Sequence, residues 1–356
     1  MKASRLFLWA VTGGSGAYVG QKVYQDGRLD SNNFGFIRFG RAALAVWKIG
    51  VDYKMTLFSK SSPASETELY EDLKSEVHKR SAETLLELCN KNGGCFIKVG
   101  QHIGALDYLL PEEYVSTMRV LHSNAPKMNL DDIYTVLQEN LKVDPKEVFD
   151  DFDEEPLGTA SLAQVHKARL KGTGEEVAVK VQHRYVKKHS FVDIHTMDFL
   201  VSVVNYVFPQ FEFMWLAEEM RKNLPLELDF TQEGHNAEKV TNMLANLTWL
   251  KVPKIHWPLS TERVLVMEYC EGGHINDKDY IIRNGIDPAT LSKNVSQMYS
   301  EMIYIHGFVH CDPHPGNVLV RKSQQGDSQL ILLDHGLYTV SLCSVNLIKA
   351  HLTDDK

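Results

Sequence analysis

Hydrophobic residues follow a helical period through the first part of the chain. Within residues 65–92 they recur every three or four positions, and Gly93 and Gly94 follow as they do at a helix C-terminus (Leu69, Leu73, Val77, Leu85 and Leu88). Pro111 suits the first turn of another helix, and Asn129 is a typical N-cap for a helix beginning at residue 130. The first 145 residues are therefore predicted to be mainly helical.

The period changes to two after Phe149. Residues 161–170 and 176–182 alternate between polar and apolar types on either side of a glycine-containing turn, which predicts a β-hairpin covered on one face. Val177, Val179 and Val181 then share one face, so Lys180 must point the other way.

The remainder mixes helices and strands. Helices are predicted at 186–207, from 211 through the 240s, and at 290–306; strands at 251–257 and 263–273, and a hairpin from 317 to 334. There are no internal repeats. This order predicts an α+β, two-lobed fold.

Composition narrows the function classes. The chain has 356 residues, 44% hydrophobic and 24% charged, as expected for a globular protein of two or three domains or lobes. A net charge of -8 argues against a nucleic-acid-binding role, which needs a basic face. Five cysteines without a C-x-x-C pair indicate reduced, intracellular thiols.

The N-terminus differs in charge from the rest. Residues 1–60 carry nine Lys or Arg and three Asp or Glu, with no acid before Asp26. An apolar run from Leu6 to Val19 is interrupted by glycines and is short for a membrane span. Residues 1–25 are therefore predicted to be a mitochondrial targeting segment or a marginal membrane anchor, the alternative being a disordered or packed terminus.

The segment 306–320, HGFVHCDPHPGNVLV, concentrates reactive side chains. His310 and His314 have the spacing of two zinc ligands on a helix, but Pro313 and Pro315 exclude a regular helix there. Asp312 and Asn317 instead match the five-residue spacing of a catalytic aspartate and a metal-binding asparagine in phosphoryl transfer, with His310 bracing the loop.

Other parts of such a site occur in the expected order. Asp334 follows a strand in a D-H-G sequence, and Lys180 in V-A-V-K is placed to reach nucleotide phosphates. The lysine needs an acidic partner from Glu227, Asp229 or Glu233, and a strand ends at Glu268 and Tyr269, where a nucleotide-binding hinge is expected. In place of a glycine-rich loop the chain has Gly158, Thr159, Ala160 and Ser161.

These motifs together resemble the ABC1/UbiB, or aarF-domain, family of atypical kinases, as do PLGTASLAQVHKA, LELDF and the K-V-G-Q element at 98–101. The resemblance implies a protein-kinase-like two-lobed fold with a helical N-terminal extension. It implies ATP or ADP with Mg²⁺ as cofactors, Lys180 paired with Glu233, Asp312 in catalysis, and Asn317 with Asp334 on the metal.

The resemblance also implies a setting and a substrate class. Lys98 and Gln101 would lie over the site near Glu227 and Asp229, which would block a protein substrate and favour a lipid or small-molecule acceptor, or ATP hydrolysis. The expected location is mitochondrial and inner-membrane associated. The expected role is in lipid or quinone homeostasis or inner-membrane organisation, with a nucleotide as ligand and no nucleic acid as partner.

Three features depart from the family pattern. The G-T-A-S loop leaves the nucleotide preference open, and Cys311 replaces the arginine that would read a phosphorylated activation loop. The chain also ends soon after Tyr338, so an incomplete C-terminal lobe with exposed apolar surface is expected.

The predicted division has four parts: a targeting or anchor segment at 1–25, a helical extension at 26–147, a kinase-like N-lobe at 148–273 and a partial C-lobe at 274–356. Two other functions stay open. One is a catalytically silent nucleotide-binding scaffold. The other is a small-molecule phosphotransferase of the aminoglycoside or choline kinase type, which does not share the K-V-G-Q and E-L-D elements.

Overall fold

The computed structural model describes residues 34–59, 67–122, 127–209, 214–323 and 326–340. The chain forms two compact units, Met1–Asn124 with Tyr185–Ala217, and Ala125–Arg184 with Glu218–Lys356. We call them unit 1 and unit 2. The predicted segment 1–25 lies outside the described residues. The predicted boundaries at 147 and 273 stay predictions, although residues 185–217 join the N-terminal helices rather than the strands beside them in sequence.

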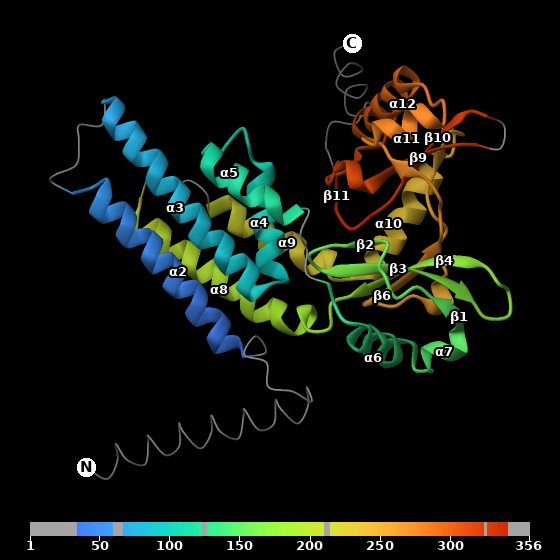
Figure 1. Ribbon diagram of the computed structural model, residues 1–356, viewed down its shortest axis with the longest axis horizontal. Coiled ribbons are helices and arrows are strands. Elements are labelled where there is room, and N and C mark those ends of the chain that lie inside the picture. The colour runs from blue at the N-terminus through green and yellow to red at the C-terminus, as the bar shows by residue number, and fades with distance from the viewer. Residues whose placement is uncertain (1–33, 60–66, 123–126, 210–213, 324–325, 341–356) are drawn as a thin grey trace, which may run out of the picture. The chain divides into compact units, whose positions relative to one another are not determined.

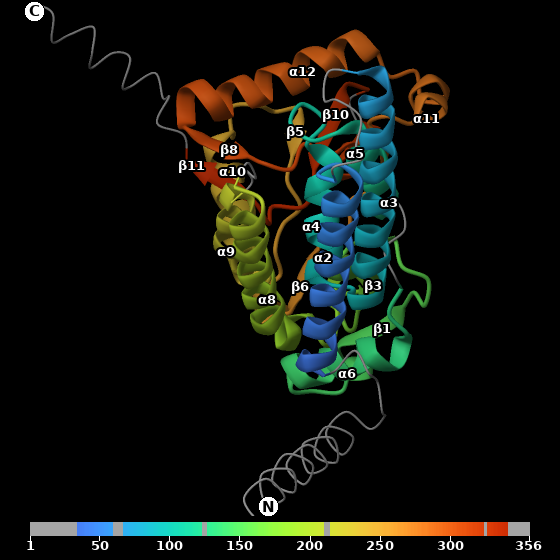
Figure 2. The same cartoon turned by 90° about the vertical axis from the view of Figure 1, so that its left-hand side faces the viewer.

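Unit 1 is helical. It contains α2 (Gly35–Thr56), α3 (Glu68–Asn92), α4 (Cys95–Ala105), α5 (Glu112–Met118), a 3₁₀ turn (Arg119–His122), α8 (Val186–Val207) and the first residues of α9 (Met214–Glu227). The helix predicted at 65–92 is confirmed as α3, with the Thr67 side chain accepting from the Tyr70 amide and Gly93 closing the helix at φ 66°. Figure 2 shows α2, α3 and α8 as long helices.

The core of unit 1 forms where these helices meet. Ala42 and Ala45 of α2 pack with Phe96 and Ile97 of α4, Leu88 of α3 and Leu200 of α8. None of the helices in the described ranges is long and apolar enough to cross a membrane.

Unit 2 begins with α6 (Leu130–Leu141), capped by the Asn129 side chain as predicted, and α7 (Pro145–Val148). An antiparallel sheet follows, in the order β1 (Phe149–Phe152), β3 (Ala163–Leu170), β4 (Glu176–Gln182), β6 (Val264–Glu268), with β2 (Gly158–Thr159) paired to β3. The hairpin prediction is confirmed.

Strand β4 corrects one expectation. Its residues 177–182 are buried, so the sheet is covered on both faces here rather than on one. One face carries Val177, Val179 and Val181, which pack on Ile133 and Val136 of α6. The opposite face carries Lys180, as the alternation predicts. Strand β4 lies between β3 and β6, so it is paired on both edges.

The helical region predicted from 211 through the 240s forms two helices, α9 (Met214–Glu227) and α10 (Phe230–Met243). The break falls at Asp229, whose carboxylate caps α10 by accepting from the Thr231 amide at 3.0 Å.

The rest of unit 2 forms a second lobe. It contains β5 (Leu250–Lys251), a 3₁₀ turn (Trp257–Leu259), β7 (Gly273–His274), α11 (Lys278–Arg283), α12 (Pro288–Ser300), β8 (Phe308–His310), β9 (Val318–Lys322), β10 (Ser328–Leu332) and β11 (Tyr338–Val340). The strand expected at 251–257 is therefore largely wrong, since Pro253 cannot donate to a ladder and β5 ends at Lys251. The helix expected at 290–306 ends at Ser300 and continues as a π-helical turn, Glu301–His306.

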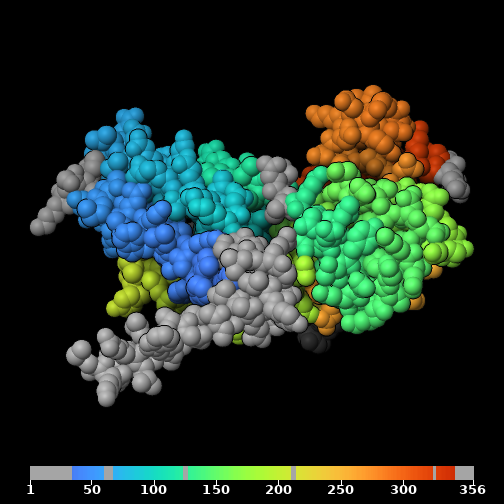
Figure 3. Space-filling model, turned by 60° about the horizontal axis from the view of Figure 1, so that its bottom comes forward, coloured from blue at the N-terminus to red at the C-terminus, as the bar shows by residue number. Residues whose placement is uncertain are grey.

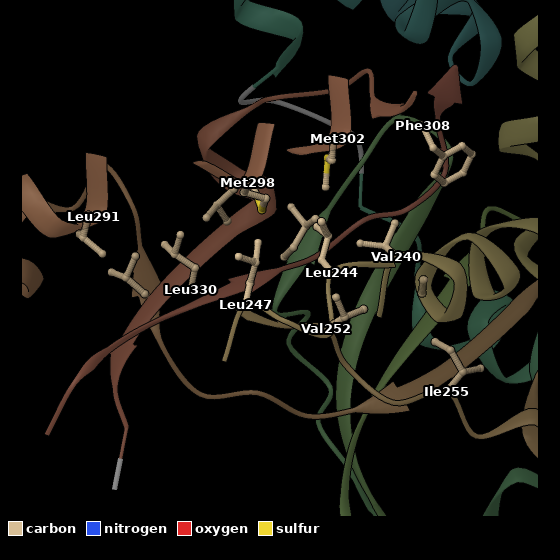
Figure 4. Packing of buried hydrophobic residues seen from close by; sticks show 14 of the residues in the cluster. Val240, Leu244, Leu247, Val252, Ile255, Leu291, Met298, Met302, Phe308 and Leu330 are labelled. Carbon is tan, nitrogen blue, oxygen red and sulfur yellow. The ribbon is translucent and has the colours of Figure 1, made fainter. Parts of the chain in front are cut away.

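This second lobe packs around a core that Ala163 of β3 and Leu265 of β6 also join. Val240 and Leu244 of α10, Leu247, Met298 of α12, Met302 and Leu330 of β10 are buried together (Figure 4). Because α10 contributes to this core while its first turn faces β4, the helix connects the sheet to the second lobe. The mixed α+β architecture with two lobes is confirmed (Figure 1).

Candidate functional site

An ion cluster joins the two lobes of unit 2. The Nζ atom of Lys180 lies 2.7 Å from Oε1 and 2.9 Å from Oε2 of Glu233, and 3.3 Å from Oδ2 of Asp334. Three residues far apart in sequence, from β4, α10 and the turn after β10, thus meet around one ammonium group. These are the lysine, the helix acid and the D-H-G aspartate that the motifs selected.

Burial gives this cluster unusual electrostatics. Lys180 is 8% exposed and Glu233 is 3% exposed. Burial alone would lower the pKa of Lys180, but the carboxylates of Asp334 and Glu233 outweigh it and raise that pKa. Burial raises the pKa of Glu233 to about 7, although the Lys180 charge opposes the shift. Lys180 is therefore held as a cation at neutral pH.

The acidic partner of Lys180 is fixed by where α10 begins. With Asp229 as N-cap, Glu233 lies in the first turn of the helix and faces β4. A neighbouring glycine makes room for close packing, since a Cβ on Gly234 would come within 2.7 Å of the Trp257 ring. Asp229 itself serves as a cap, and Glu227 lies at the end of α9.

Asp334 adopts a backbone conformation that few non-glycine residues use. Its φ is 43°, in the left-handed region. The turn is held by the Gly336 amide, which donates to Oδ1 of Asp334 at 3.1 Å. This geometry leaves Oδ2 directed at Lys180 and makes the Asp334 carboxylate, 37% exposed, the accessible member of the cluster.

The segment 306–320 is tied to Asp334 by His310. The amide of Asp312 donates to Nδ1 of His310 at 3.2 Å, so the ring proton lies on Nε2 and is donated to the Asp334 carbonyl at 2.7 Å. His310 thus braces the loop, as predicted, and fixes Asp312 relative to Asp334.

Asn317 is held beside the same turn. The side-chain amide of Asn317 donates to the backbone carbonyl of Asp312 at 3.1 Å. The backbone carbonyl of Asn317 accepts from the Leu333 amide at 2.8 Å. Strands β9 and β10 are antiparallel, and Val318 pairs with Leu332. One position further, Asn317 therefore lies beside Leu333, the residue before Asp334. The sequence-predicted residues Asp312, Asn317 and Asp334 are therefore brought together.

Two contributors were not selected from sequence. His335 is 4% exposed; its Nε2–H donates to the Leu332 carbonyl at 3.1 Å, so its Nδ1 accepts from the Tyr338 hydroxyl at 2.9 Å. Asn236 of α10 donates to the His335 carbonyl at 2.9 Å. Burial, with His310 nearby, lowers the pKa of His335 to about 4 and keeps the ring neutral. The only sequence signal was that the D-H-G-L-Y segment follows an apolar strand.

The loop in place of a glycine-rich turn lies across the sheet from Lys180. Gly158 pairs with Val165, which pairs with Lys180, so the three lie in one row. Ala160 donates its amide to the Ala163 carbonyl at 2.8 Å and accepts from the His183 ring at 3.0 Å. The Thr159 side chain is partly exposed, and Ser161 is buried. A Cβ on Gly158 would meet nothing within 4 Å, so local packing does not require glycine there.

The expected hinge lies at the end of β6. The Glu268 carboxylate accepts from Lys251 at 2.6 Å and from the Lys254 amide at 3.2 Å. The Tyr269 ring lies 4.3 Å from the Nζ atom of Lys167. Both side chains are therefore engaged within the protein, and the backbone amides of Glu268 and Tyr269 donate to the carbonyls of Lys254 and Glu176.

The K-V-G-Q element lies in unit 1, on α4. Gln101 donates to the Leu121 carbonyl at 3.0 Å, and a Cβ on Gly100 would come within 2.3 Å of a Leu121 methyl carbon. These two residues have packing roles in the helical unit. Lys98 is also on α4, and its predicted position over Glu227 and Asp229 stays a prediction.

The side chains around Asp334 include possible magnesium ligands. No group of three or more His, Cys, Asp or Glu side chains that could hold a metal occurs among the residues that the structure describes. Mg²⁺, however, usually takes one or two carboxylates and completes its shell with phosphate oxygens and water. Asp334 and Asn317 provide one carboxylate and one amide oxygen from two adjoining turns, and this fits Mg²⁺ carried on a nucleotide.

Comparison with known proteins identifies the family. A family model described as the ABC1 atypical kinase-like domain matches residues 120–342. AarF domain-containing kinase 1 of Drosophila melanogaster is 53% identical over 95% of this chain and 65% of its own length. AarF domain-containing protein kinase 1 of Gallus gallus is 56% identical over 89% and 61% of the two chains, and that of Mus musculus 52% over 99% and 66%.

This chain spans 61–66% of the length of these relatives. Among solved structures, Rv3197 of Mycobacterium tuberculosis in complex with erythromycin aligns with a TM-score of 0.48 and 24% identity, over 76% of this chain and 67% of that one. The match of the family model, together with relatives above 50% identity, confirms the resemblance read from the motifs. The chain belongs to the ABC1 atypical kinase-like family.

Proposed function

We propose that unit 2 binds ATP or ADP with Mg²⁺ and catalyses phosphoryl transfer, to an acceptor or to water. The observation that carries this proposal is the cluster in which Lys180 contacts Glu233 at 2.7 Å and Asp334 at 3.3 Å. A buried lysine held as a cation between two carboxylates, next to an asparagine on the adjoining turn, has the parts that phosphoryl transfer requires.

Each residue has a role that its contacts support. Glu233 holds Lys180 in place, and Lys180 would contact the nucleotide phosphates. Asp334 and Asn317 would hold Mg²⁺, which when bound neutralises charge on the phosphates. Asp312, fixed by His310 and Asn317, would orient the acceptor hydroxyl or water.

The loop at Gly158 bears on which nucleotide is used. Its amides and carbonyls are partly engaged with Ala163 and His183, so it has fewer free amides for phosphate than a glycine-rich loop. ATP and ADP are therefore both included in the proposal. Cys311, directly before Asp312, stands where an arginine would read a phosphorylated activation loop, which supports a site without control by activation-loop phosphorylation.

The proposals for the phosphate acceptor and for the cellular location rest on the sequence. We propose a lipid or small-molecule acceptor and an inner-membrane-associated mitochondrial location, with a role in lipid or quinone homeostasis or in inner-membrane organisation. The acid-poor, basic N-terminus supports the location, and membership of the family supports the acceptor class.

Turnover tests the proposal. Purified chain is incubated with Mg²⁺ and ATP, and ADP and phosphate are followed by ³¹P NMR, beside Asp312→Asn and Asp334→Asn. An exposed residue of the same unit, Ile282, provides the control Ile282→Ser. Asp312→Asn is expected to lower turnover about 10²- to 10⁴-fold while leaving nucleotide binding intact. Binding without turnover in the wild type would instead favour the silent scaffold, and equal turnover in all variants would reject this site.

A further inference from the structure

Helix α2 has an unusual distribution of side chains, because its outward face is apolar. A surface helix normally buries its apolar stripe and exposes charge. In α2, Trp47 is 63% exposed and Met55 is 71% exposed. The exposed apolar residues recur at helical spacing along its whole length: Phe36, Phe39, Leu44, Trp47, Val51 and Met55.

Helix α8 extends the same surface. It packs along α2, with the Phe39 and Phe199 rings 6.1 Å apart, and the two helices belong to the same unit. Figure 3 shows the surface of α2 in blue, with part of α8 in yellow-green beside it. The exposed apolar residues of α8 are Phe191, Phe199, Val203, Tyr206 and Val207.

The inward face of α2 explains why this surface cannot turn into the core. Arg38 is 2% exposed and donates to both carboxylate oxygens of Asp193 on α8, with one distance of 2.7 Å. Its guanidinium also donates to the Asn92 carbonyl. Rotating α2 to bury Trp47 would break this buried ion pair, so the helix is locked with its aromatic side outward.

The most exposed charged residues of the two helices are all lysines: Lys48, Lys54, Lys187 and Lys188. The acidic residues of the two helices are less exposed. Asp52 is half-buried and pairs with Arg80 of α3 at 3.0 Å, Asp198 is half-buried, and Asp193 is buried against Arg38. The Nζ atom of Lys54 lies 5.0 Å and 4.8 Å from the ring centroids of Phe58 and Phe208. Aromatic residues interspersed with lysine are typical of helices that lie in a membrane interface.

We infer that the α2/α8 face docks on an anionic lipid surface. Trp, Tyr and Phe side chains would enter the interfacial layer, while the lysines would contact lipid phosphates. A second copy of the chain is a poorer occupant, because a two-fold interface places the same patch on both partners and would bring lysines against lysines. The inference is independent of nucleotide binding and assigns a folded surface to membrane contact.

Vesicle sedimentation tests this with the full chain. Vesicles of phosphatidylcholine alone are compared with equal mixtures of phosphatidylcholine and phosphatidylserine. The test variants are Trp47→Glu with Phe199→Glu, and Lys48→Gln with Lys54→Gln. The matched control is Ile282→Glu with Tyr304→Glu, at two exposed apolar positions of unit 2. Circular dichroism checks that each variant folds.

The chain should bind the anionic vesicles, and binding should weaken with salt. The Trp47/Phe199 variant should lose at least about tenfold in affinity, and each lysine replaced should cost about fivefold. The control and Asp334→Asn should bind as the wild type does. The inference is overturned if the folded Trp47/Phe199 variant binds equally well, if the folded wild type ignores anionic vesicles, or if that variant instead abolishes a dimer of the wild type.

Discussion

The buried contact between Lys180 and Glu233 makes a quantitative prediction. Removing one partner of a buried ion pair usually costs about 3–5 kcal/mol, because a charge is left without compensation. In Glu233→Gln the lysine keeps Asp334 at 3.3 Å, so we expect the low end, about 3 kcal/mol of unfolding free energy. In Lys180→Met the loss should be smaller, because Glu233 has a pKa of about 7 and can take up a proton.

The two changes together should be less damaging than their sum. In the double variant Lys180→Met with Glu233→Gln neither charge remains in the interior, so the loss should approach that of the worse single variant. This corresponds to a coupling energy of about 1–3 kcal/mol. Urea unfolding at pH 7, followed by circular dichroism, gives the four free energies.

The exposed ion pair of Lys127 with Glu155 in the same unit supplies the control. Glu155→Gln should leave the free energy of unfolding unchanged within error. The reasoning is refuted if the two single losses add to within about 0.5 kcal/mol in the double variant, since distant, uncoupled sites behave in that way.

Three further predictions concern the rest of the chain. Arg38→Ala should lower the unfolding free energy by about 3–5 kcal/mol in urea titrations, since Asp193 would be left buried without its cation, whereas a loss below about 1 kcal/mol would contradict the locked helix. Burial lowers the pKa of His166, so its stabilising contribution is present above its unfolded pKa and lost as pH falls. Between pH 7.5 and 5.5 the wild type should lose up to about 1.4 kcal/mol more unfolding free energy than His166→Gln does. Equal losses in the two proteins would contradict this. Gly100→Ala should destabilise by about 1–3 kcal/mol in thermal unfolding because its Cβ would come within 2.3 Å of a buried methyl carbon, while Gly158→Ala, with nothing within 4 Å, should not.

Sequence periodicity was sufficient to predict the direction of a side chain where the pattern allowed a single secondary structure. The alternation in 176–182 placed Lys180 opposite the three valines, and β4 has that arrangement. The partner of Lys180 could not be chosen from pattern alone, because Glu227, Asp229 and Glu233 were all within reach. The choice depends on Asp229 ending one helix and beginning the next, which turns Glu233 toward β4.

Other features depend on tertiary context. The contact of His335 with Tyr338 depends on the left-handed backbone at Asp334. That backbone conformation could not be predicted from the residue types. The outward face of α2 runs against the usual pattern, since hydrophobicity alone would bury Trp47 and expose Arg38. The reversal depends on distant partners: Asp193, 155 residues away, and the Asn92 carbonyl, 54 residues away.

The most direct test of the nucleotide site is thermal unfolding with and without ligand. The chain is heated with Mg²⁺ and ATP, Mg²⁺ and ADP, ATP without Mg²⁺, or buffer alone, beside Asp334→Asn and the control Ile282→Ser. At a hundred times its dissociation constant, a ligand adds about 2.7 kcal/mol, which raises the unfolding midpoint of unit 2 by roughly 5–10 °C. We predict a rise that requires Mg²⁺, persists in the control and disappears in Asp334→Asn. A cooperative transition that nucleotide does not move, or a rise equally large in Asp334→Asn, would contradict a nucleotide site built on this cluster.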